Sequence, residues 1–148
     1  MIHCCIRQEK VTATAEEKIR QKLIQYMLGE LKFPKHSLLL ECQLAHLPHL
    51  SNAKNLPNRR FDLLCMAKGI HPEHALFPLL IVECKAVKLD QDVITQVVGY
   101  NHYVQAPFVA IANHERLVWG EQREEGYVFQ DGLPSFEDLL KLASKEHN

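Results

Sequence analysis

The sequence has little net charge and no long apolar run. Its 17 lysines and arginines against 18 aspartates and glutamates give a formal net charge of -1, and the sequence pI is about 6.7. There is therefore no basic field to attract nucleic acid from a distance, and any such contact must come from local clusters. No apolar stretch approaches the roughly 18 residues that span a bilayer, and no basic segment followed by an apolar run marks a signal peptide. We expect a cytoplasmic protein that does not contact membranes.

Cysteine pairs and metal-ligand spacings are also scarce. The five cysteines are an odd number and are scattered, which is typical of reduced thiols rather than of a disulfide framework. His46-x-x-His49 and His71-x-x-His74 have the spacing of transition-metal ligands, but no Cys-x-x-Cys accompanies them. We interpret both pairs as surface histidines in loops.

The length and composition indicate one globular domain over residues 1–148. With 47% hydrophobic and 24% charged residues, the chain is long enough and apolar enough to bury a core. It contains no internal repeat, low-complexity segment or linker at which a domain boundary would fall.

Apolar periodicity alternates between helical and strand-like spacing, which predicts an α/β fold. Helices are expected from Thr12 or Thr14 to just before Phe33-Pro34, from Lys88 or Asp90 to just before Pro107, and from Ser135 to Leu142. Strands are expected at 38–44, 59–68, 76–86, 108–112, 117–120 and 127–129, with a further edge strand around Ile2 and Ile6. The fold class is therefore a mixed central sheet of about five strands flanked by helices.

In the first helix, one face is apolar and one is charged. The apolar stripe comprises Ile19, Leu23, Tyr26, Met27 and Leu31. The side expected to be mostly solvated comprises Glu16, Lys18, Arg20 and Lys22. Threonine caps and acids in the first turn suit a helix N-terminus.

The third strand carries the most informative stretch. Its apolar run from Leu79 to Val82, typical of a strand buried on both faces, leads directly into Glu83-Cys84-Lys85. Side chains alternate along a strand, so Glu83 and Lys85 leave it on the same face. Placing an acid and an amine at a buried strand is costly. An isolated Glu-x-Lys can also be a salt bridge or a strand end, and that interpretation stays open at this point.

The second and third strands are expected to form a hairpin around Pro72. If the turn centres between Pro72 and Glu73, paired residue numbers sum to 145 and Asp62 lies opposite Glu83. Directly opposite residues share a face with their Cβ atoms about 5 Å apart. A slip of one residue would separate the two carboxylates. The geometry thus allows one cluster of Asp62, Glu83 and Lys85.

Such a cluster suits one kind of chemistry. Two carboxylates about 5 Å apart repel each other, and a hard divalent cation such as Mg²⁺ or Mn²⁺ relieves that repulsion with oxygen ligands and bound waters. A lysine beside the cation can position a water or stabilise charge growing on a phosphate. The cluster therefore indicates metal-assisted phosphodiester hydrolysis.

The spacing of Asp62 and Glu83-Cys84-Lys85 resembles the PD-(D/E)XK nuclease signature. The surrounding segments are similar to the N-terminal nuclease domain of type I restriction enzyme R subunits and its stand-alone relatives. These segments are Glu16 to Gln21, Arg60-Phe61-Asp62, Pro78 to Lys85 and Gln96 to Asn101. The resemblance covers about residues 12–120 and implies a restriction-endonuclease-like fold. Phe61 stands where the signature's name has a proline.

The resemblance also implies roles for individual residues. Asp62 and Glu83 would bind the metal, Lys85 would be the catalytic lysine, and the carbonyl of Cys84 would be a further ligand. Gln96 matches the family's glutamine in the second helix. Glu17 matches an acid in the first helix that helps to bind metal, and Glu41 is a weaker addition.

Nucleic-acid contacts are expected from a few local residues. Arg59 and Arg60 can contact phosphates, although a solvated strand end explains them equally well. Tyr100 shares a helical face with Gln96 and can stack on a base or pack in the core.

Two classes of function remain open. The first is a Mg²⁺- or Mn²⁺-dependent endonuclease acting on DNA, without the motor domain of an R subunit, because no Gly-x-x-x-x-Gly-Lys-Ser/Thr phosphate loop is present. It could act with a separate motor or specificity subunit or as a homodimer. The second is a catalytically silent nuclease-fold module that binds nucleic acid or protein. The combination of Asp62, Glu83, Lys85 and Gln96 favours the first.

Overall fold

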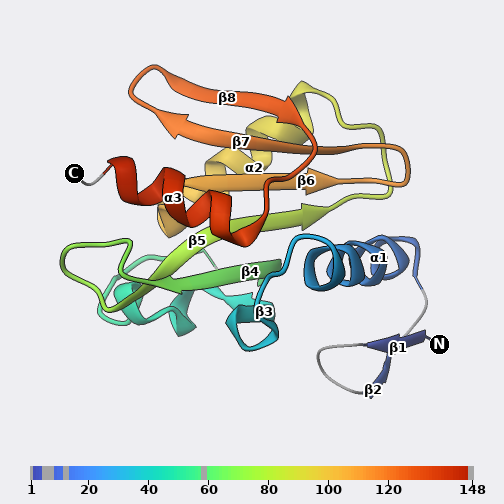
Figure 1. Cartoon of the computed structure of the whole chain (residues 1–148), viewed down its shortest axis with the longest axis horizontal. Coiled ribbons are helices and arrows are strands. Elements are labelled where there is room, and N and C mark those ends of the chain that lie inside the picture. The colour runs from blue at the N-terminus through green and yellow to red at the C-terminus, as the bar shows by residue number, and fades with distance from the viewer. Residues whose placement is uncertain (1, 5–8, 12–13, 58–59, 147–148) are drawn as a thin grey trace.

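The computed structural model describes residues 2–4, 9–11, 14–57 and 60–146. Its centre is a six-stranded sheet in the order β3-β4-β5-β6-β7-β8 (Figure 1). The strands are β3 (Leu38–Gln43), β4 (Arg60–Lys68), β5 (Leu76–Cys84), β6 (Phe108–Ala112), β7 (Leu117–Arg123) and β8 (Gly126–Asp131). Only β5 and β6 run parallel, because helix α2 (Gln91–Val104) connects them; all other neighbours are antiparallel. The mixed α/β sheet is confirmed, with six strands rather than about five.

Helices cover both faces of the sheet. One face packs against α1 (Ala15–Gly29) and α3 (Phe136–Glu146), and the other packs against α2 (Figure 1). Short 3-10 turns, η1 (Lys35–Ser37), η2 (Leu44–His46) and η3 (Pro48–Leu50), occupy the region around β3. The predicted capping of the last helix is present, since Asp138 N donates to Ser135 Oγ at 3.2 Å. The central strand β5 is buried over Leu79 to Val82, so the prediction from its apolar run is confirmed.

Helix α1 begins as the sequence predicts. Thr14 is its N-cap and accepts a hydrogen bond from Glu17 N at 3.1 Å. The stripe of Ile19, Leu23, Met27 and Leu31 is buried. Two expectations are wrong: Tyr26 is 42% exposed, and Arg20, expected in solvent, is only 5% exposed. Arg20 is one helical turn before Ile24 and two before Met27, so it lies on the buried face.

A separate two-stranded hairpin precedes α1. It pairs β1 (Ile2–Cys4) with β2 (Glu9–Val11) in antiparallel register. The predicted strand at Ile2 is present, but it does not extend the main sheet. Ile6 lies outside the described residues.

The β4–β5 hairpin contains a register shift. Near the end of β5 the pairs are Leu63 with Val82 and Leu64 with Ile81, which sum to the predicted 145. Nearer the turn, Met66 pairs with Pro78 and the sum becomes 144, with the shift between Cys65 and Met66. Proline cannot donate to a ladder, and a bulge is one of the few places a strand tolerates it. The predicted register is therefore confirmed where the carboxylates lie.

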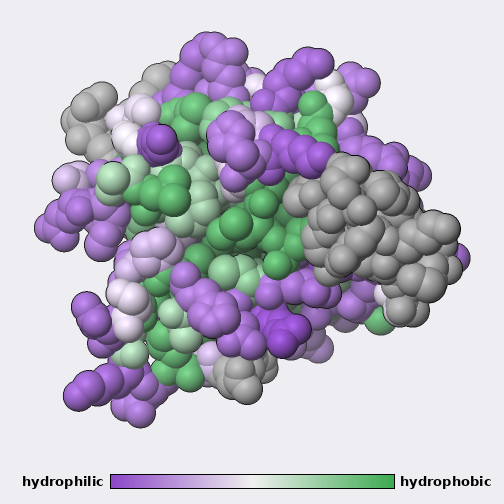
Figure 2. All heavy atoms as spheres, turned by 90° about the horizontal axis from the view of Figure 1, so that it is seen from below, coloured by the Kyte–Doolittle hydropathy of each residue, from purple (hydrophilic) through white to green (hydrophobic). Residues whose placement is uncertain are grey.

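The surface combines polar and apolar areas. Figure 2, seen from below, shows apolar side chains gathered in the middle of the face toward which the edge strand β3 lies in Figure 1. Leu39 of β3 is 38% exposed. No helix in the described part of the chain has the length and apolar character needed to cross a membrane.

Candidate active site

Three acidic residues lie in a row across three neighbouring strands. In β3, Leu40 pairs with Leu63 and Cys42 with Phe61, so the register sets Glu41 opposite Asp62. Continuing the pair Leu63–Val82 by one residue sets Asp62 opposite Glu83. Glu41 has φ of 50°, a left-handed conformation that marks an irregularity in the edge strand at this point. The row lies near the C-terminal end of β5, where the chain leaves the sheet.

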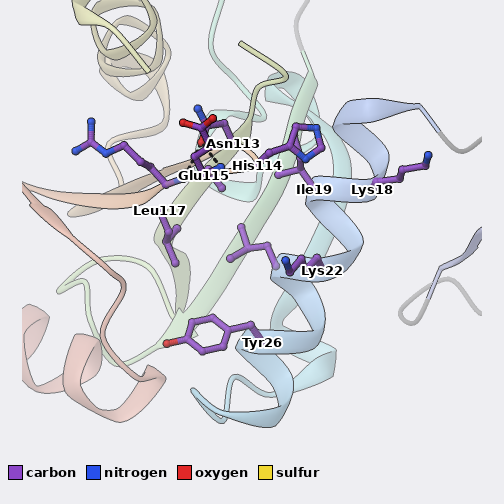
Figure 3. A pocket seen from close by; sticks show the side chains of 11 residues that line it. Lys18, Ile19, Lys22, Tyr26, Asn113, His114, Glu115 and Leu117 are labelled. Atoms are coloured by element: carbon purple, nitrogen blue, oxygen red, sulfur yellow. Dashed lines mark hydrogen bonds between the residues drawn. The ribbon is translucent and has the colours of Figure 1, made fainter. Parts of the chain in front are cut away.

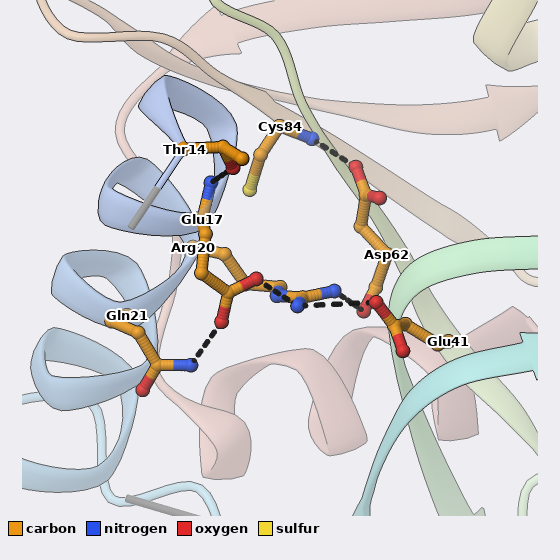
Figure 4. Close-up of polar contacts among 7 residues, drawn as sticks. All are labelled: Thr14, Glu17, Arg20, Gln21, Glu41, Asp62 and Cys84. Carbon is orange, nitrogen blue, oxygen red and sulfur yellow. Dashed lines mark hydrogen bonds and ion pairs between the residues drawn. The ribbon is translucent and has the colours of Figure 1, made fainter. Parts of the chain in front are cut away.

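The side chain of Asp62 lies beside Glu83 and accepts a hydrogen bond from the main chain of the residue that follows Glu83. Asp62 Oδ2 accepts a hydrogen bond from Cys84 N at 2.8 Å (Figure 4). Glu83 is 4% exposed, and its Oε1 has no hydrogen-bond partner among the described residues. Burial, and then the charge of the Asp62 carboxylate, raise the pKa of Glu83 to about 8. A buried, unsatisfied carboxylate beside a second carboxylate is a group that a cation would stabilise.

Lys85 is held next to this pair by its main chain. It follows the last residue of β5, is half-buried, and its N–H donates to Ala112 O at 2.9 Å. Its positive charge lowers the pKa of Glu83, against the larger effect of burial. Among the described residues, however, no ion pair joins Lys85 to Glu83. The structure therefore does not support the interpretation of Glu83-Cys84-Lys85 as a salt bridge.

Arg20 is a site residue that the sequence did not reveal. From α1 it forms a buried ion pair with Glu17 Oε2, donates to the main-chain oxygen of Asp62 at 3.4 Å, and reaches Glu41 Oε1 at 3.4 Å (Figure 4). One guanidinium thus contacts three elements around the acidic row. The available signal was the spacing of Arg20 with buried Ile24 and Met27.

Glu17 already has partners within α1. Besides the ion pair with Arg20, its Oε1 accepts a hydrogen bond from Gln21 Nε2 at 2.8 Å (Figure 4). Both carboxylate oxygens are therefore engaged, so metal binding by Glu17 would require a change of partners. Cys84 is 1% exposed, and burial raises the pKa of its thiol well above the ordinary range. That thiol is an inert packing group.

The remaining predicted site residues lie further out. Gln96 is exposed on α2 and forms no hydrogen bond with Asp62, Glu83 or Lys85 in the described structure. Tyr100 is half-buried and packs against the core under α2, and Arg60 is exposed at the start of β4. Arg59 lies outside the described residues.

The two histidine pairs are rearranged by the fold. His49 does not group with His46 but with His71 and His74 around the ring of Phe77, at centroid distances of 4.7, 4.4 and 5.8 Å respectively from that ring. Burial, followed by the neighbouring His74 and His71, lowers the pKa of His49, against a hydrogen bond with Val104 O at 2.9 Å. This aromatic cluster packs the far end of β5.

The donor set at Asp62 and Glu83 suits a hard cation. Within the described ranges, no three histidine, cysteine, aspartate or glutamate side chains lie close enough to hold a metal ion together. The carboxyl groups of Asp62 and Glu83 nevertheless lie side by side at the end of β5. Mg²⁺ commonly binds through one or two carboxylates and keeps several waters, and Mn²⁺ favours the same oxygen donors. The residues therefore fit such an ion at the end of β5.

A mixed sheet between helices, with an acid pair at the ends of its central hairpin, defines a restriction-endonuclease-like α/β domain. The family described as the Type I restriction enzyme R protein N terminus matches residues 15–134, and the chain belongs to that family. The match covers α1, the whole main sheet and α2. Comparisons with curated proteins and with solved structures found no match.

Proposed function

We propose that this chain is a metal-dependent endonuclease that hydrolyses phosphodiester bonds in DNA. The observation that supports it most is Glu83, which is 4% exposed, has no hydrogen-bond partner for Oε1 in the described part of the chain, and lies beside the carboxyl group of Asp62. With its pKa raised to about 8, Glu83 is largely protonated near neutral pH, and a divalent cation bound beside Asp62 would stabilise its charged form. Family membership supports the same activity.

Asp62 and Glu83 would hold Mg²⁺ or Mn²⁺, with the Cys84 carbonyl as a further ligand. When bound, the ion would supply Lewis-acid activation of a water and a phosphate oxygen. The hydrogen bond from Cys84 N fixes Asp62 Oδ2, leaving the rest of that carboxylate for coordination. Arg20 fixes the Asp62 main chain from the other side, so the ligand is oriented before a cation arrives.

Lys85 would act on the substrate rather than on the fold. Its main chain is fixed by Ala112 O, while its side chain is half-buried and without an ion-pair partner among the described residues. An ammonium in that position can donate to a phosphate oxygen as negative charge grows in the transition state. Gln96 would join the site only when substrate or metal draws the exposed side chain inward.

The family suggests DNA and other restriction subunits as partners. We propose DNA as the substrate and a separate motor or specificity subunit as the source of translocation or sequence choice. Formation of a homodimer stays a prediction.

A silent binding module is the second candidate, and one observation favours it. Glu17 is engaged by Arg20 and Gln21 instead of being available to a metal. If the site has lost its chemistry, the fold would serve docking alone.

Cleavage and metal binding separate the two candidates. Purified chain is incubated with linear, nicked and single-stranded DNA in Mg²⁺, in Mn²⁺ and in EDTA, and Mn²⁺ binding is followed by calorimetry. The nuclease proposal expects metal-dependent cleavage that Glu83→Gln abolishes, while Glu124→Gln, at an exposed acid on the β7–β8 turn, does not. Absence of Mn²⁺ binding by the wild-type chain would overturn it in favour of the silent module.

A further inference from the structure

A groove of about 430 Å³ lies between α1 and the turn that joins β6 and β7 (Figure 3). Its floor is apolar, with Ile19 and Leu23 from α1 facing Leu117 of β7. Tyr26 stands at one end of it, 42% exposed. Ile19 and Leu23 are buried core residues, and Leu117 is half-buried against the same core.

The rim of the groove is positively charged. Lys18, Lys22 and Arg116 line it against a single acid, Glu115, although the whole chain has a net charge of -1. Lys18 and Lys22 are exposed and have no ion-pair partner among the described residues. Arg116 is ion-paired with Asp131 at 3.1 Å, so the two lysines are the available cations.

The groove adjoins the proposed active site. Ala112, which lines the groove, pairs with Cys84 and accepts the main-chain hydrogen bond of Lys85 at 2.9 Å. Asn113 braces the turn at this point, since its side chain accepts from Arg116 N at 2.7 Å and donates to Val87 O at 3.0 Å. Ala112 and Cys84 face α1, whereas Glu83, paired with Ile111, and Lys85 alternate to the face that α2 covers, so the groove reaches the end of β5 from the opposite face of the sheet.

The chemistry of the groove matches one class of occupant. A volume of about 430 Å³ falls in the range of roughly 300–1,000 Å³ that accommodates small ligands, which is room for a base and its sugar. Single-stranded nucleic acid binds where cations follow the backbone and an aromatic side chain offers a stacking surface. Lys18 and Lys22 supply the first and Tyr26 the second.

We infer that this groove holds a single-stranded stretch of DNA that passes the end of β5 to reach the proposed active site on the other face of the sheet, so the substrate carries a single-stranded or locally unpaired segment. The inference rests on the proposed nuclease function for the cut itself, but it concerns binding. Lys18 and Lys22 contact phosphates, and Tyr26 stacks on a base.

Binding is measured in EDTA, where no cleavage occurs, by fluorescence anisotropy of a labelled oligothymidylate and of a blunt duplex of equal length. The wild-type chain should bind the single strand more tightly than the duplex. The Lys18→Ala, Lys22→Ala double variant should weaken binding and reduce the salt slope by about 1.4, because each phosphate contact on a single strand contributes roughly 0.7. Tyr26→Ala should weaken binding about fivefold or more, and Tyr26→Phe should restore it.

The matched control is the Lys35→Ala, Lys141→Ala double variant. It changes the net charge equally at two exposed lysines outside the groove. Equal binding by the groove and control variants would overturn the inference, and so would preference for the duplex. Displacement of oligothymidylate by oligoglutamate at equal charge would assign the groove to acidic peptides instead.

Cleavage separates this inference from the function on which it rests. If the wild-type chain binds single strands through Lys18 and Lys22 but cuts nothing in Mg²⁺ or Mn²⁺, the nuclease proposal fails and the groove assignment holds. If it cuts DNA while the groove variant binds and cuts as the control does, the groove assignment fails alone.

Discussion

Lys85 and Asp62 supply different chemistry at the proposed site, so losing each should have a different result. Lys85→Ala should slow cleavage roughly a hundredfold to a thousandfold while leaving the fold and Mn²⁺ binding intact, because the ammonium stabilises charge only in the transition state. Asp62→Ala should weaken Mn²⁺ binding itself, since it removes a ligand and its charge. Single-turnover cleavage, Mn²⁺ calorimetry and melting temperature on the same preparations check both.

Lys88→Ala provides the control, because Lys88 is an exposed lysine three residues further along. A folded Lys85→Ala variant that cuts at the wild-type rate would refute the catalytic role.

Arg20 and Glu17 form a buried ion pair whose loss should be costly. Arg20→Ala leaves the Glu17 carboxylate, in a residue 8% exposed, without its cation. Breaking such a pair typically costs about 3–5 kcal/mol, whereas replacing both partners with apolar residues costs much less. Urea unfolding should therefore show a larger loss of stability for Arg20→Ala than for Glu17→Met combined with Arg20→Leu.

The exposed pair between Lys141 and Glu137, at 3.3 Å, gives the comparison. Lys141→Ala should change the free energy of unfolding by less than about 0.5 kcal/mol. An equally small effect of Arg20→Ala would show that the buried network does not stabilise the fold.

His49 makes stability depend on pH in a defined direction. Its pKa is lowered in the folded protein, mainly by burial, so the unfolded chain binds the proton first as pH falls below about 6.5. The stabilisation from keeping this ring neutral is present above that pH and is lost as pH falls toward the folded pKa. Lowering the pH from roughly 7 to 5 should therefore reduce the stability of the wild type relative to His49→Gln, measured as melting temperature. This difference leaves out the opposite effect of Glu83, whose raised pKa acts equally in both proteins.

His102→Gln is the matched control, because His102 is exposed on α2. Equal pH dependence in His49→Gln and His102→Gln would remove His49 as the cause.

Sequence reasoning at this scale located the acid pair and missed the arginine. Asp62 and Glu83 could be paired because both lie on strands of one hairpin, where spacing determines which residues face each other. Arg20 was placed in solvent because charged residues on an amphipathic helix usually are. Glu17 lies one helical turn from Arg20 within α1, but only the tertiary fold brings Glu41 and the Asp62 main chain to it.

Among the elements, the β7–β8 hairpin has one especially tight contact. A Cβ built at Gly120 would lie 2.7 Å from Cε1 of Phe129, its cross-strand partner. The Phe129 ring covers the glycine, so Gly120→Ala forces the ring to move. We expect a loss of about 1–3 kcal/mol of stability, as overpacking typically produces.

Denaturant unfolding of Gly120→Ala alone and combined with Phe129→Ala measures this effect. In the background of Phe129→Ala, the alanine at position 120 should cost much less, because the ring is gone. Additive losses would show that the ring does not cause the strain.

Most element boundaries followed from local sequence. The strand Phe108–Ala112 and the caps at Thr14 and Asp90 occur as predicted, because apolar runs and capping residues act locally. The strand expected around Ile2 and Ile6 was predicted to lie at the edge of the sheet, but β1 pairs with β2 in a separate hairpin, since strand pairing partners depend on long-range packing that a local pattern does not contain. The grouping of His49 with His71 and His74 was missed for the same reason.

For the whole molecule, near-zero net charge limits DNA binding. The isolated chain should bind DNA weakly and with a shallow salt dependence, with a slope of about -2 to -4 in log–log terms, because few phosphates can be contacted. Titration of labelled DNA at several salt concentrations measures the slope. Tight binding at roughly 200 mM salt would point to a larger basic surface than the groove lined by Lys18 and Lys22.

The shift between Cys65 and Met66 separates the two halves of the β4–β5 hairpin. On the side of the acids, at Leu63–Val82, the numbers of paired residues sum to 145. Near the Pro72 turn they sum to 144. The bulge therefore separates the strand pairing near the turn from the pairing near the acids. A change of one residue in the turn need not move Asp62 and Glu83 to opposite faces of the sheet. An insertion or deletion in the loop at 69–75 should therefore leave Asp62 and Glu83 aligned, because the pairing on their side of the bulge does not follow the count at the turn.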